Sequence, residues 1–280
     1  MRFVAVGDVF VDVICGRAPR PGRRVHADVS LRPGGSAVNA ALAAASLGVE
    51  AAVVGRVGAD PGAELVTAAL AAAGVDAALA RDPELGTGVA VVLLGDDGPG
   101  VVADRGANAR FSPADVPDRL DGGVLLVSGF ALLQEGSDAA AQAALERFTG
   151  EWAGIDLASP ALARAADLAA LARLASVVFA TAAEARAATG LEPVEAVREL
   201  ARSFSVACVK LGVEGALAAQ ADLVERRAAP AVAGPLSFGA GDAFAAAFLV
   251  SAARGDALGA ALDRACAAGA KAVHGARSPV

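Results

Sequence analysis

A glycine-rich stretch near the C-terminal end of the chain reads Pro235-Leu236-Ser237-Phe238-Gly239-Ala240-Gly241-Asp242. It leads directly into an apolar segment, 241–253, that is predicted to be a buried helix. Glycines let the backbone approach a ligand closely, and the amides at a helix N-terminus attract anions. The backbone of Gly239, Ala240 and Gly241 is therefore a candidate anion hole, and Asp242 a candidate general base for a hydroxyl proton. On capping preferences alone, Asp242 is equally an ordinary helix cap.

Two further loops carry polar groups in apolar surroundings. The first reads Arg32-Pro33-Gly34-Gly35-Ser36-Ala37-Val38-Asn39. Asn39 lies within an Ala/Leu helix with apolar neighbours on both sides, which favours a ligand contact over a solvent-facing position. Its amide can both donate and accept hydrogen bonds, which suits a polyhydroxy ligand. The second loop reads Val6-Gly7-Asp8-Val9-Phe10-Val11-Asp12. We expect Asp8 to serve a turn or cap and Asp12 to contact ligand, because burial of a bare carboxylate is costly.

Short apolar strands and helices alternate along most of the chain. Strands are expected at 3–6, 51–54, 124–127, 154–157, 176–179 and 206–210, followed by a hairpin at 216–219 and 223–226. Helices are expected at 36–47, 62–73, 137–148, after Pro160, and at 182–189, 193–202, 241–253 and 256–273. Continuous apolar strands separated by helices indicate an α/β protein with a mainly parallel sheet covered on both faces.

Two segments interrupt this alternation. Residues 25–31 alternate apolar and polar side chains, and residues 88–103 form two strands around an Asp-Asp-Gly-Pro-Gly turn. Pattern alone leaves two interpretations open: a small antiparallel flap beside the main sheet, or two ordinary surface hairpins.

Composition excludes several classes of function. The 280 residues carry a net charge of −7, which disfavours nucleic acid as a partner. The longest relevant apolar run, 243–253, is well short of the roughly 18 residues that cross a bilayer, and acids occupy the place of a signal peptide's apolar stretch, so we expect a cytoplasmic protein with no membrane partner. The three cysteines contain no CxxC motif and are expected to be free thiols, and two histidines argue against a His-based metal site.

Taken in order, these motifs resemble the PfkB family of carbohydrate kinases, which have the ribokinase-like fold. The stretch 34–48 together with Gly55-Arg56-Val57-Gly58-Ala59-Asp60 is similar to the family's N-terminal signature, and 239–242 to the core of its second signature. Arg105-Gly106-Ala107-Asn108 and Lys210-Leu211-Gly212-Val213-Glu214-Gly215 also stand at family-like places. Two ordered signatures about 200 residues apart make the match specific.

The resemblance implies a single domain over 1–280: a three-layer αβα sandwich with a small antiparallel β lid formed by about 13–33 and 86–110. It implies transfer of the γ-phosphoryl of ATP, with Mg²⁺, to a sugar hydroxyl, with Asp242 as general base and the backbone of 239–241 as the anion hole. On the acceptor side it implies contacts from Asp12, Gly34, Gly35, Asn39, Arg105 and Asn108. On the nucleotide side it implies contacts from Lys210, Gly212, Gly215 and Ser237, with Glu184 acting on Mg²⁺ through water.

The chain also departs from the family's pattern. Leu236 stands where relatives carry an Asp that helps to bind a monovalent cation, so we expect no K⁺ requirement. Thr181 replaces the Asn of the Asn-x-x-Glu motif, and Phe10 and Ser36 argue against ribose as the acceptor. Arg105 has two interpretations, as a ligand for a substrate phosphate or carboxylate and as an ion pair with a nearby acid. Unpaired lid edges predict a homodimer as a hypothesis. The alternatives to a sugar kinase are a degenerate kinase that senses a sugar or nucleotide without turnover, and a nucleoside kinase of the same family.

Overall fold

The computed structural model describes residues 1–18, 22, 24–95, 98–231 and 238–275, and within them the chain forms two sheets. A nine-stranded sheet in the described residues has the order β13-β12-β11-β10-β9-β8-β1-β4-β5. All its pairs from β11 to β5 are parallel, and only the β11–β12 and β12–β13 pairs are antiparallel. Its strands are β1 (Arg2–Val6), β4 (Glu50–Gly58), β5 (Val75–Asp82), β8 (Val124–Val127), β9 (Trp152–Asp156), β10 (Val177–Thr181), β11 (Val206–Lys210), β12 (Ala216–Gln220) and β13 (Leu223–Arg227).

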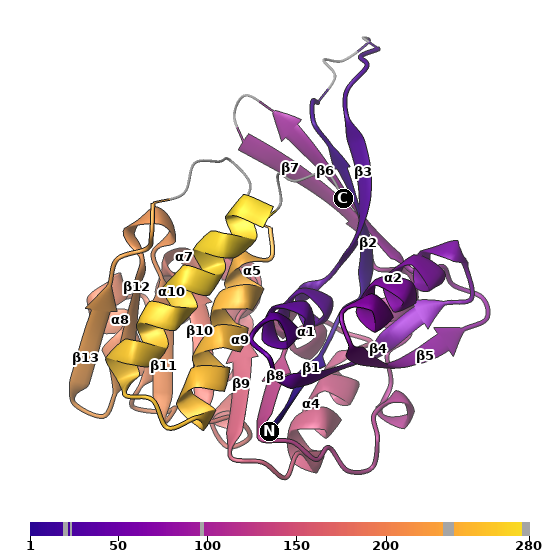
Figure 1. Cartoon of the computed structure of the whole chain (residues 1–280). Coiled ribbons are helices and arrows are strands. Elements are labelled where there is room, and N and C mark those ends of the chain that lie inside the picture. Colours follow the sequence, from indigo (N-terminus) through magenta and orange to yellow (C-terminus); the bar gives the residue numbers. More distant parts are fainter. Residues whose placement is uncertain (19–21, 23, 96–97, 232–237, 276–280) are drawn as a thin grey trace.

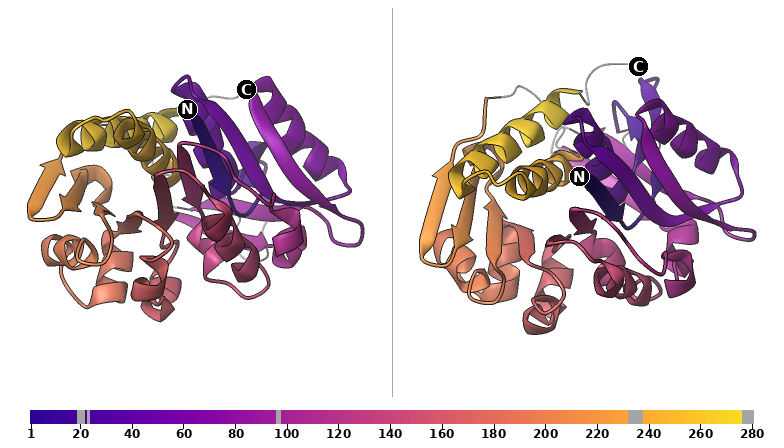
Figure 2. Two further views of the ribbon diagram at one scale, coloured as in Figure 1. Left: turned by 90° about the horizontal axis from the view of Figure 1, so that it is seen from below. Right: turned by 60° about the horizontal axis from the view of Figure 1, so that its bottom comes forward.

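Helices cover both faces of this sheet. One layer contains α1 (Ser36–Ser46), α2 (Pro61–Ala72), α9 (Ala240–Ala253) and α10 (Leu258–Gly275). The other contains α3 (Gly129–Leu132), α4 (Asp138–Arg147), α5 (Pro160–Ala165), α6 (Leu168–Leu171), α7 (Ala182–Thr189) and α8 (Pro193–Leu200), and three short 3₁₀ turns, η1 (Gly106–Arg110), η2 (Pro113–Asp115) and η3 (Gly212–Glu214), lie in the connections. Figure 2 shows the yellow helices α9 and α10 on one side of the strands and the salmon-coloured helices on the other.

Alternation along the central strand explains the three layers. Phe3 and Ala5 of β1 pack toward α1, α2, α9 and α10, whereas Val4 and Val6 pack toward the opposite helices. Because successive strand residues point to opposite faces, an apolar strand buried on both sides builds two cores at once. The expected α/β class and αβα sandwich are confirmed.

A second sheet projects from one end of this body (Figure 1). Its order is β3-β2-β6-β7, from β2 (Phe10–Cys15), β3 (Val29–Gly34), β6 (Gly88–Gly95) and β7 (Gly98–Asp104). The β2–β3 and β6–β7 pairs are antiparallel, and β2 and β6 run parallel where the two pairs join. The two irregular segments therefore form one flap, and not two separate hairpins. We call this sheet the lid.

Most expected elements lie where the pattern predicts them, but two strands, the short helix α3 and the 3₁₀ turns were not expected. The sequence analysis missed β5, whose short apolar run Ala77-Ala78-Leu79-Ala80 is flanked by charged residues and has one β-branched neighbour, Val75; in the described residues β5 pairs only with β4, at the edge of the sheet. It also did not predict the strand that begins at Phe10, because the loop and the strand share one apolar stretch. The three cysteines are free thiols, as expected. Within the described residues, no helix combines the length and the apolar character needed to cross a bilayer.

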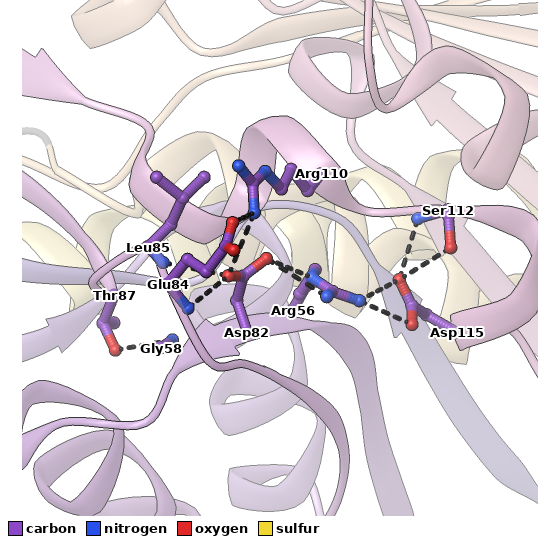
Figure 3. A network of polar contacts seen from close by, with 9 residues as sticks. All are labelled: Arg56, Gly58, Asp82, Glu84, Leu85, Thr87, Arg110, Ser112 and Asp115. Atoms are coloured by element: carbon purple, nitrogen blue, oxygen red, sulfur yellow. Dashed lines mark hydrogen bonds and ion pairs between the residues drawn. The ribbon is translucent and has the colours of Figure 1, made fainter.

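A buried polar network anchors the lid to the body (Figure 3). Arg56, on β4, donates to Asp82 at 3.1 Å and to both carboxylate oxygens of Asp115 at 2.9 and 3.0 Å. The Asp82 carboxylate accepts the backbone N–H groups of Leu85 and Glu84, which together with Arg56 lower its pKa to about 2. These contacts fix the loop that enters β6.

Asp60 fixes the same loop from its other side. Its carboxylate accepts the backbone N–H and the hydroxyl of Thr87, both at 2.6 Å, and caps α2 through the Ala63 N–H. The second half of the N-terminal signature, Arg56 and Asp60, therefore positions the chain where it enters the lid.

Candidate active site

The N-termini of α1 and α9 meet at a hydrogen bond between the two glycine-rich segments. Asn39 Nδ2 donates to Asp242 Oδ2 at 3.0 Å, although the two residues are 203 positions apart in the sequence. Gly239 has a φ of 73° and would bring a side chain to 3.2 Å from the Asn39 amide. Glycine at this position therefore permits both the left-handed turn into α9 and the close approach of the two helices.

Both of these helices begin without a side-chain cap. Gly35 stands at the N-cap of α1 and Gly239 at that of α9, and within the described residues neither helix has a side-chain hydrogen bond to its first-turn amides. The described helices α3, α4 and α8 likewise have no side-chain cap, whereas α2, α5, α6 and α7 are capped by Asp60, Ser159, Asp167 and Thr181. The uncapped first turn of α9 presents backbone donors and the positive end of the helix dipole beside Asp242.

The Asp242 carboxyl group has a pKa close to neutral pH. Its pKa is raised to about 7: burial is the largest cause, the negative charges of Asp156 and Asp12 act in the same direction, and the Asn39 hydrogen bond and Lys210 act against it. A carboxyl group with a pKa near physiological pH is suited to general base catalysis. The expectation that Asp242 is only a cap does not fit, because α9 has no side-chain cap in the described residues.

Asp12 reaches the same site from the lid. It lies on β2, opposite Arg32 of β3 in the register, and burial raises its pKa to about 6. A side chain at Gly34 would meet the Asp12 carboxylate at 2.2 Å, and one at Gly35 would meet the Asp8 carbonyl oxygen at 2.2 Å. The glycine pair is therefore required where the lid strand turns into α1, so that Asp12 lies against that turn.

A second polar cluster lies at the ends of β9, β10 and β11. Lys210 forms an ion pair with Asp156, and both side chains are more than four-fifths buried. Glu184 forms a capping box with Thr181, accepting the Thr181 N–H at 2.7 Å. Burial raises the pKa of Glu184, and the charge of Asp156 adds to this effect. Burial would lower the pKa of Lys210, but Asp156, Glu184 and Asp242 together raise it.

A pocket of about 630 Å³ opens beside the Asn39–Gly239 contact, and Asp242 is not among its lining residues but borders a separate small cavity with Asp156 and Ser36. Asp12 and Asn39 line the larger pocket together with Gly239 and Phe238. It continues along the outer surfaces of α1, α9 and α10. A volume of this size is within the usual range for small-molecule sites.

Arg105 and Asn108 lie at the base of the lid, outside the residues that line this pocket. Arg105 donates to Asp8 at 3.2 Å and to Ser137 at 2.6 Å, which supports its interpretation as an ion pair. The buried Asn108 amide accepts from the Val9 N–H at 2.8 Å and donates to the Val9 and Arg105 carbonyl oxygens. Both residues hold the β1–β2 loop in place.

The expected nucleotide-side residues lie at the β11–β12 turn. Gly212 and Gly215 have φ values of 64° and 98°, and a side chain at Gly215 would meet the Arg227 carbonyl oxygen at 1.9 Å. Lys210 Nζ lies 3.2 Å from the position that a Cβ at Gly241 would occupy, so the end of β11 borders the anion-hole segment. Ser237, and Leu236 with its bearing on a monovalent cation, lie outside the described residues.

A scan against known protein families matches residues 2–278 to the pfkB family carbohydrate kinase. The chain belongs to this family. Carbohydrate kinases are phosphotransferases, so the chain is an enzyme of that class, a sugar or nucleoside kinase. A search among curated proteins gave no match.

Solved structures of kinases share the fold over almost the whole chain. Adenosine kinase from Sinorhizobium meliloti is 24% identical, with a TM-score of 0.84, covering 97% of this chain and 93% of that one. A fructokinase double mutant from Vibrio cholerae O395, bound to fructose, ADP and potassium ion, is 28% identical, with a TM-score of 0.81 and coverage of 97% and 92%. A putative ribokinase II from E. coli, in complex with ATP and Mg²⁺, is 21% identical, with a TM-score of 0.86 and the same coverage.

Sequence reasoning missed three residues that the fold brings to this region. Asp156 follows an unremarkable strand, and only its pairing with Lys210 reveals it. Arg32 was given no role in the site by the sequence, yet it lines the pocket, and Lys271 lines it from α10. The sequence could not predict that Arg32 lies opposite Asp12, because the strand that begins at Phe10 was itself not predicted.

Proposed function

We propose that the chain transfers the γ-phosphoryl group of ATP to a hydroxyl of a sugar or sugar-like acceptor, with Asp242 as general base. The observation that carries the proposal is the Asn39–Asp242 hydrogen bond, which joins the two signatures at the uncapped start of α9. Because Asn39 occupies Oδ2, we assign Oδ1 to the proton of the acceptor hydroxyl. The base then abstracts that proton as the oxygen attacks phosphorus.

The backbone amides of Gly239, Ala240 and Gly241 are assigned to the transferring phosphoryl group. They lie at the positive end of α9 with no competing side-chain cap in the described residues. Fixed donors at this position stabilise the negative charge on the phosphoryl oxygens without reorganisation during the reaction. Asp12, Gly35 and Asn39 are assigned to the acceptor's hydroxyls, and Lys210, Gly212 and Gly215 to the nucleotide side.

Asp156 and Glu184 fit a magnesium ion bound together with the nucleotide. Burial raises the pKa of Glu184 and the charge of Asp156 adds to the rise, so a cation near the two carboxylates would relieve their repulsion. Mg²⁺ is commonly held by one or two carboxylates together with waters and phosphates, which two carboxylates beside a nucleotide could supply. When bound, Mg²⁺ would neutralise phosphate charge. Lys210, paired with Asp156, limits the net charge of this cluster.

The proposal is tested by incubating the protein with Mg·ATP and a panel of sugars, sugar acids, sugar phosphates and nucleosides, and following ADP. Asp242→Asn should lower kcat for the best acceptor by about 10²–10⁴-fold, the usual contribution of a general base. Asp138→Asn is the matched control, because Asp138 is also an acid in the first turn of a helix but is exposed on α4. Unchanged turnover in Asp242→Asn would show that the base is wrongly assigned. Acceptor binding by calorimetry with no ADP from any acceptor would favour a sensor.

A further inference from the structure

A buried hydroxyl group without a hydrogen-bond partner directly follows β8. Ser128 is 4% exposed, and its Oγ forms no hydrogen bond with any described residue. Arg105 Nε is the other buried side-chain atom without a partner in the described part of the chain, but the same guanidinium group donates to Asp8 and Ser137. The Ser128 side chain has no second polar atom that could compensate. Because an unsatisfied buried hydroxyl lowers stability, its presence at this position requires an explanation.

The surroundings of Ser128 hold it in place. Its backbone N–H donates to the Val6 carbonyl oxygen at 2.9 Å, and its own carbonyl oxygen accepts the Leu132 N–H at 3.0 Å. A side chain at Gly7 would lie 2.5 Å from the Ser128 Cβ, so the glycine leaves the room that the serine occupies. The backbone of Ser128 is therefore fixed at both of its polar groups, and its hydroxyl stays buried at the end of the central strands.

Ser128 borders the small cavity that also touches the candidate base. This cavity has a volume of about 10 Å³, and its polar lining residues are Ser36, Ser128, Asp156 and Asp242. Among the described residues, none lines both this cavity and the 630 Å³ pocket. A buried water needs about this much room and two to four polar partners. The cavity is therefore too small for an acceptor and has the size and the lining of a site for one water molecule.

The hydrogen bonds around the cavity leave acceptors for such a water. Within the described part of the chain, Asn39 alone donates to the Asp242 carboxylate, and the Asp156 carboxylate accepts from Lys210 and from one backbone N–H. Each carboxylate has about four acceptor positions, so both can accept a further hydrogen bond. A water has one donor for each carboxylate and can accept the Ser128 O–H. This arrangement gives the hydroxyl a partner and places donors between two negative charges.

We propose that Ser128 binds a water molecule in this cavity, and that the water donates to Asp242 and Asp156 and so holds the base in position. The inference rests on the proposed kinase function, in which Asp242 is the general base. Asn39 contacts one oxygen of the Asp242 carboxylate, and the water supplies a second, independent contact that fixes the rotation of the group. A general base acts only when it is aligned with the proton that it removes. Ser128 is therefore a positioning residue for the reaction.

Ser128→Ala removes the hydroxyl with little change in volume. We expect kcat to fall about three- to tenfold, the usual worth of one hydrogen bond, with KM for the acceptor and for ATP unchanged. The midpoint of the pH profile of kcat/KM should move about 0.5 to 1 pH unit higher, because the lost hydrogen bond favours the ionised form of Asp242. Asp156, Asp12 and Lys210, the other charged groups that act on Asp242, are unchanged in this variant. Its free energy of unfolding should not fall, because the hydroxyl has no partner among the described residues.

Ser176→Ala is the matched control. Ser176 directly precedes β10, at the end of the sheet opposite the site, and its hydroxyl bonds to both the N–H and the carbonyl oxygen of Ala153. Its removal should lower the free energy of unfolding and leave kcat and the pH midpoint unchanged. Wild-type kcat and midpoint in Ser128→Ala would overturn the inference, whatever the stability of that variant. A higher KM for the acceptor with an unchanged midpoint would mean that the hydroxyl binds the acceptor directly, which also overturns it.

The water itself is tested without turnover. A high-resolution crystal structure of the unliganded protein should show one water within hydrogen-bond distance of Ser128, Asp156 and Asp242, and the Ser128→Ala crystal should show it lost or weakened. An empty cavity in the unmodified protein overturns the inference, whether or not the chain is an active kinase. If no acceptor yields ADP, the proposed function fails, and the Asp242 pKa measured by carboxyl ¹³C NMR decides the inference. Equal pKa values in the unmodified protein and in Ser128→Ala would overturn it.

Discussion

Asp242 shows how burial changes the chemistry of a single carboxyl group. Its pKa of about 7, against an ordinary value of 3.8, results first from burial, with the charges of Asp156 and Asp12 adding to the rise. Because the pKa is raised, Asp242 in the folded protein keeps its proton between about pH 4 and pH 7, a range in which the same carboxyl group of the unfolded chain has lost it. The Asp242 contribution to stability is therefore present at low pH and is lost as the pH rises through 7. Catalysis has the opposite requirement, since a general base must be deprotonated.

This opposition predicts the pH profile of the proposed reaction. We expect kcat/KM to rise with pH to a plateau, with a midpoint near the Asp242 pKa of about 7. In Asp12→Asn the midpoint of the residual activity should move to lower pH, because the variant removes a like charge that raises the Asp242 pKa. The measurement is initial rate at low acceptor concentration from pH 5 to 9. A profile that is flat between pH 6 and 8 would contradict the assigned base.

Site residues that belong to a sequence motif can be predicted from the sequence. Site residues that come together only in the tertiary structure cannot. Asp242 and Asn39 are predictable because glycines or apolar helix neighbours set them apart in the sequence. Asp156 is not, because its significance lies in its ion pair with Lys210, 54 residues away. Arg105 was correctly placed at the base of the lid, but sequence cannot show that Asp8 and Ser137 engage its guanidinium.

Among the elements, the lid was predictable in outline and its attachment was not. The alternation in 25–31 indicates one strand and the turn signal in 88–103 one strand pair, but the strand β2 and its parallel contact with β6, which joins the two segments, were not predicted. The attachment relies on Asn108, whose amide satisfies the N–H and the carbonyl of Val9 between β1 and β2. An amide inside a 3₁₀ turn carries no sequence signal for such a role.

Removing this amide should loosen the lid. In Asn108→Ala the buried Val9 N–H and carbonyl groups lose their partner, which should lower the free energy of unfolding by about 2–4 kcal/mol. The displaced β1–β2 loop leads directly into β2, which carries Asp12, so KM for the acceptor should rise more than KM for ATP. Chemical denaturation and steady-state kinetics measure the two effects. Gln142→Ala, an exposed amide on α4, is the control and should change neither. Wild-type stability in Asn108→Ala would show that the Val9 contacts are not needed.

On the scale of the whole molecule, the outer face of the lid carries an apolar row. The register places Leu31, Val13, Val91 and Val102 side by side across all four strands. At the two edges, Leu31 is 59% and Val102 is 68% exposed. The opposite face contributes Asp12, Ile14 and Arg32 to the acceptor pocket. An apolar row ending at unpaired strand edges is a surface that a second sheet can cover.

We therefore predict that the chain forms a homodimer through the outer face and edges of the lid. Light scattering at micromolar concentration should give a mass near twice the 27.4 kDa of one chain. Val102→Glu places a charge in the apolar row and should shift the mass to that of the monomer, because an unpaired charge buried in an interface is costly. Val101→Glu is the matched control: it adds the same charge to the neighbouring position of β7, on the opposite face, where Val101 is also exposed. A monomeric mass for the unmodified chain would rule out the dimer, and equal loss in both variants would mean that the strand edge, and not the apolar face, forms the contact.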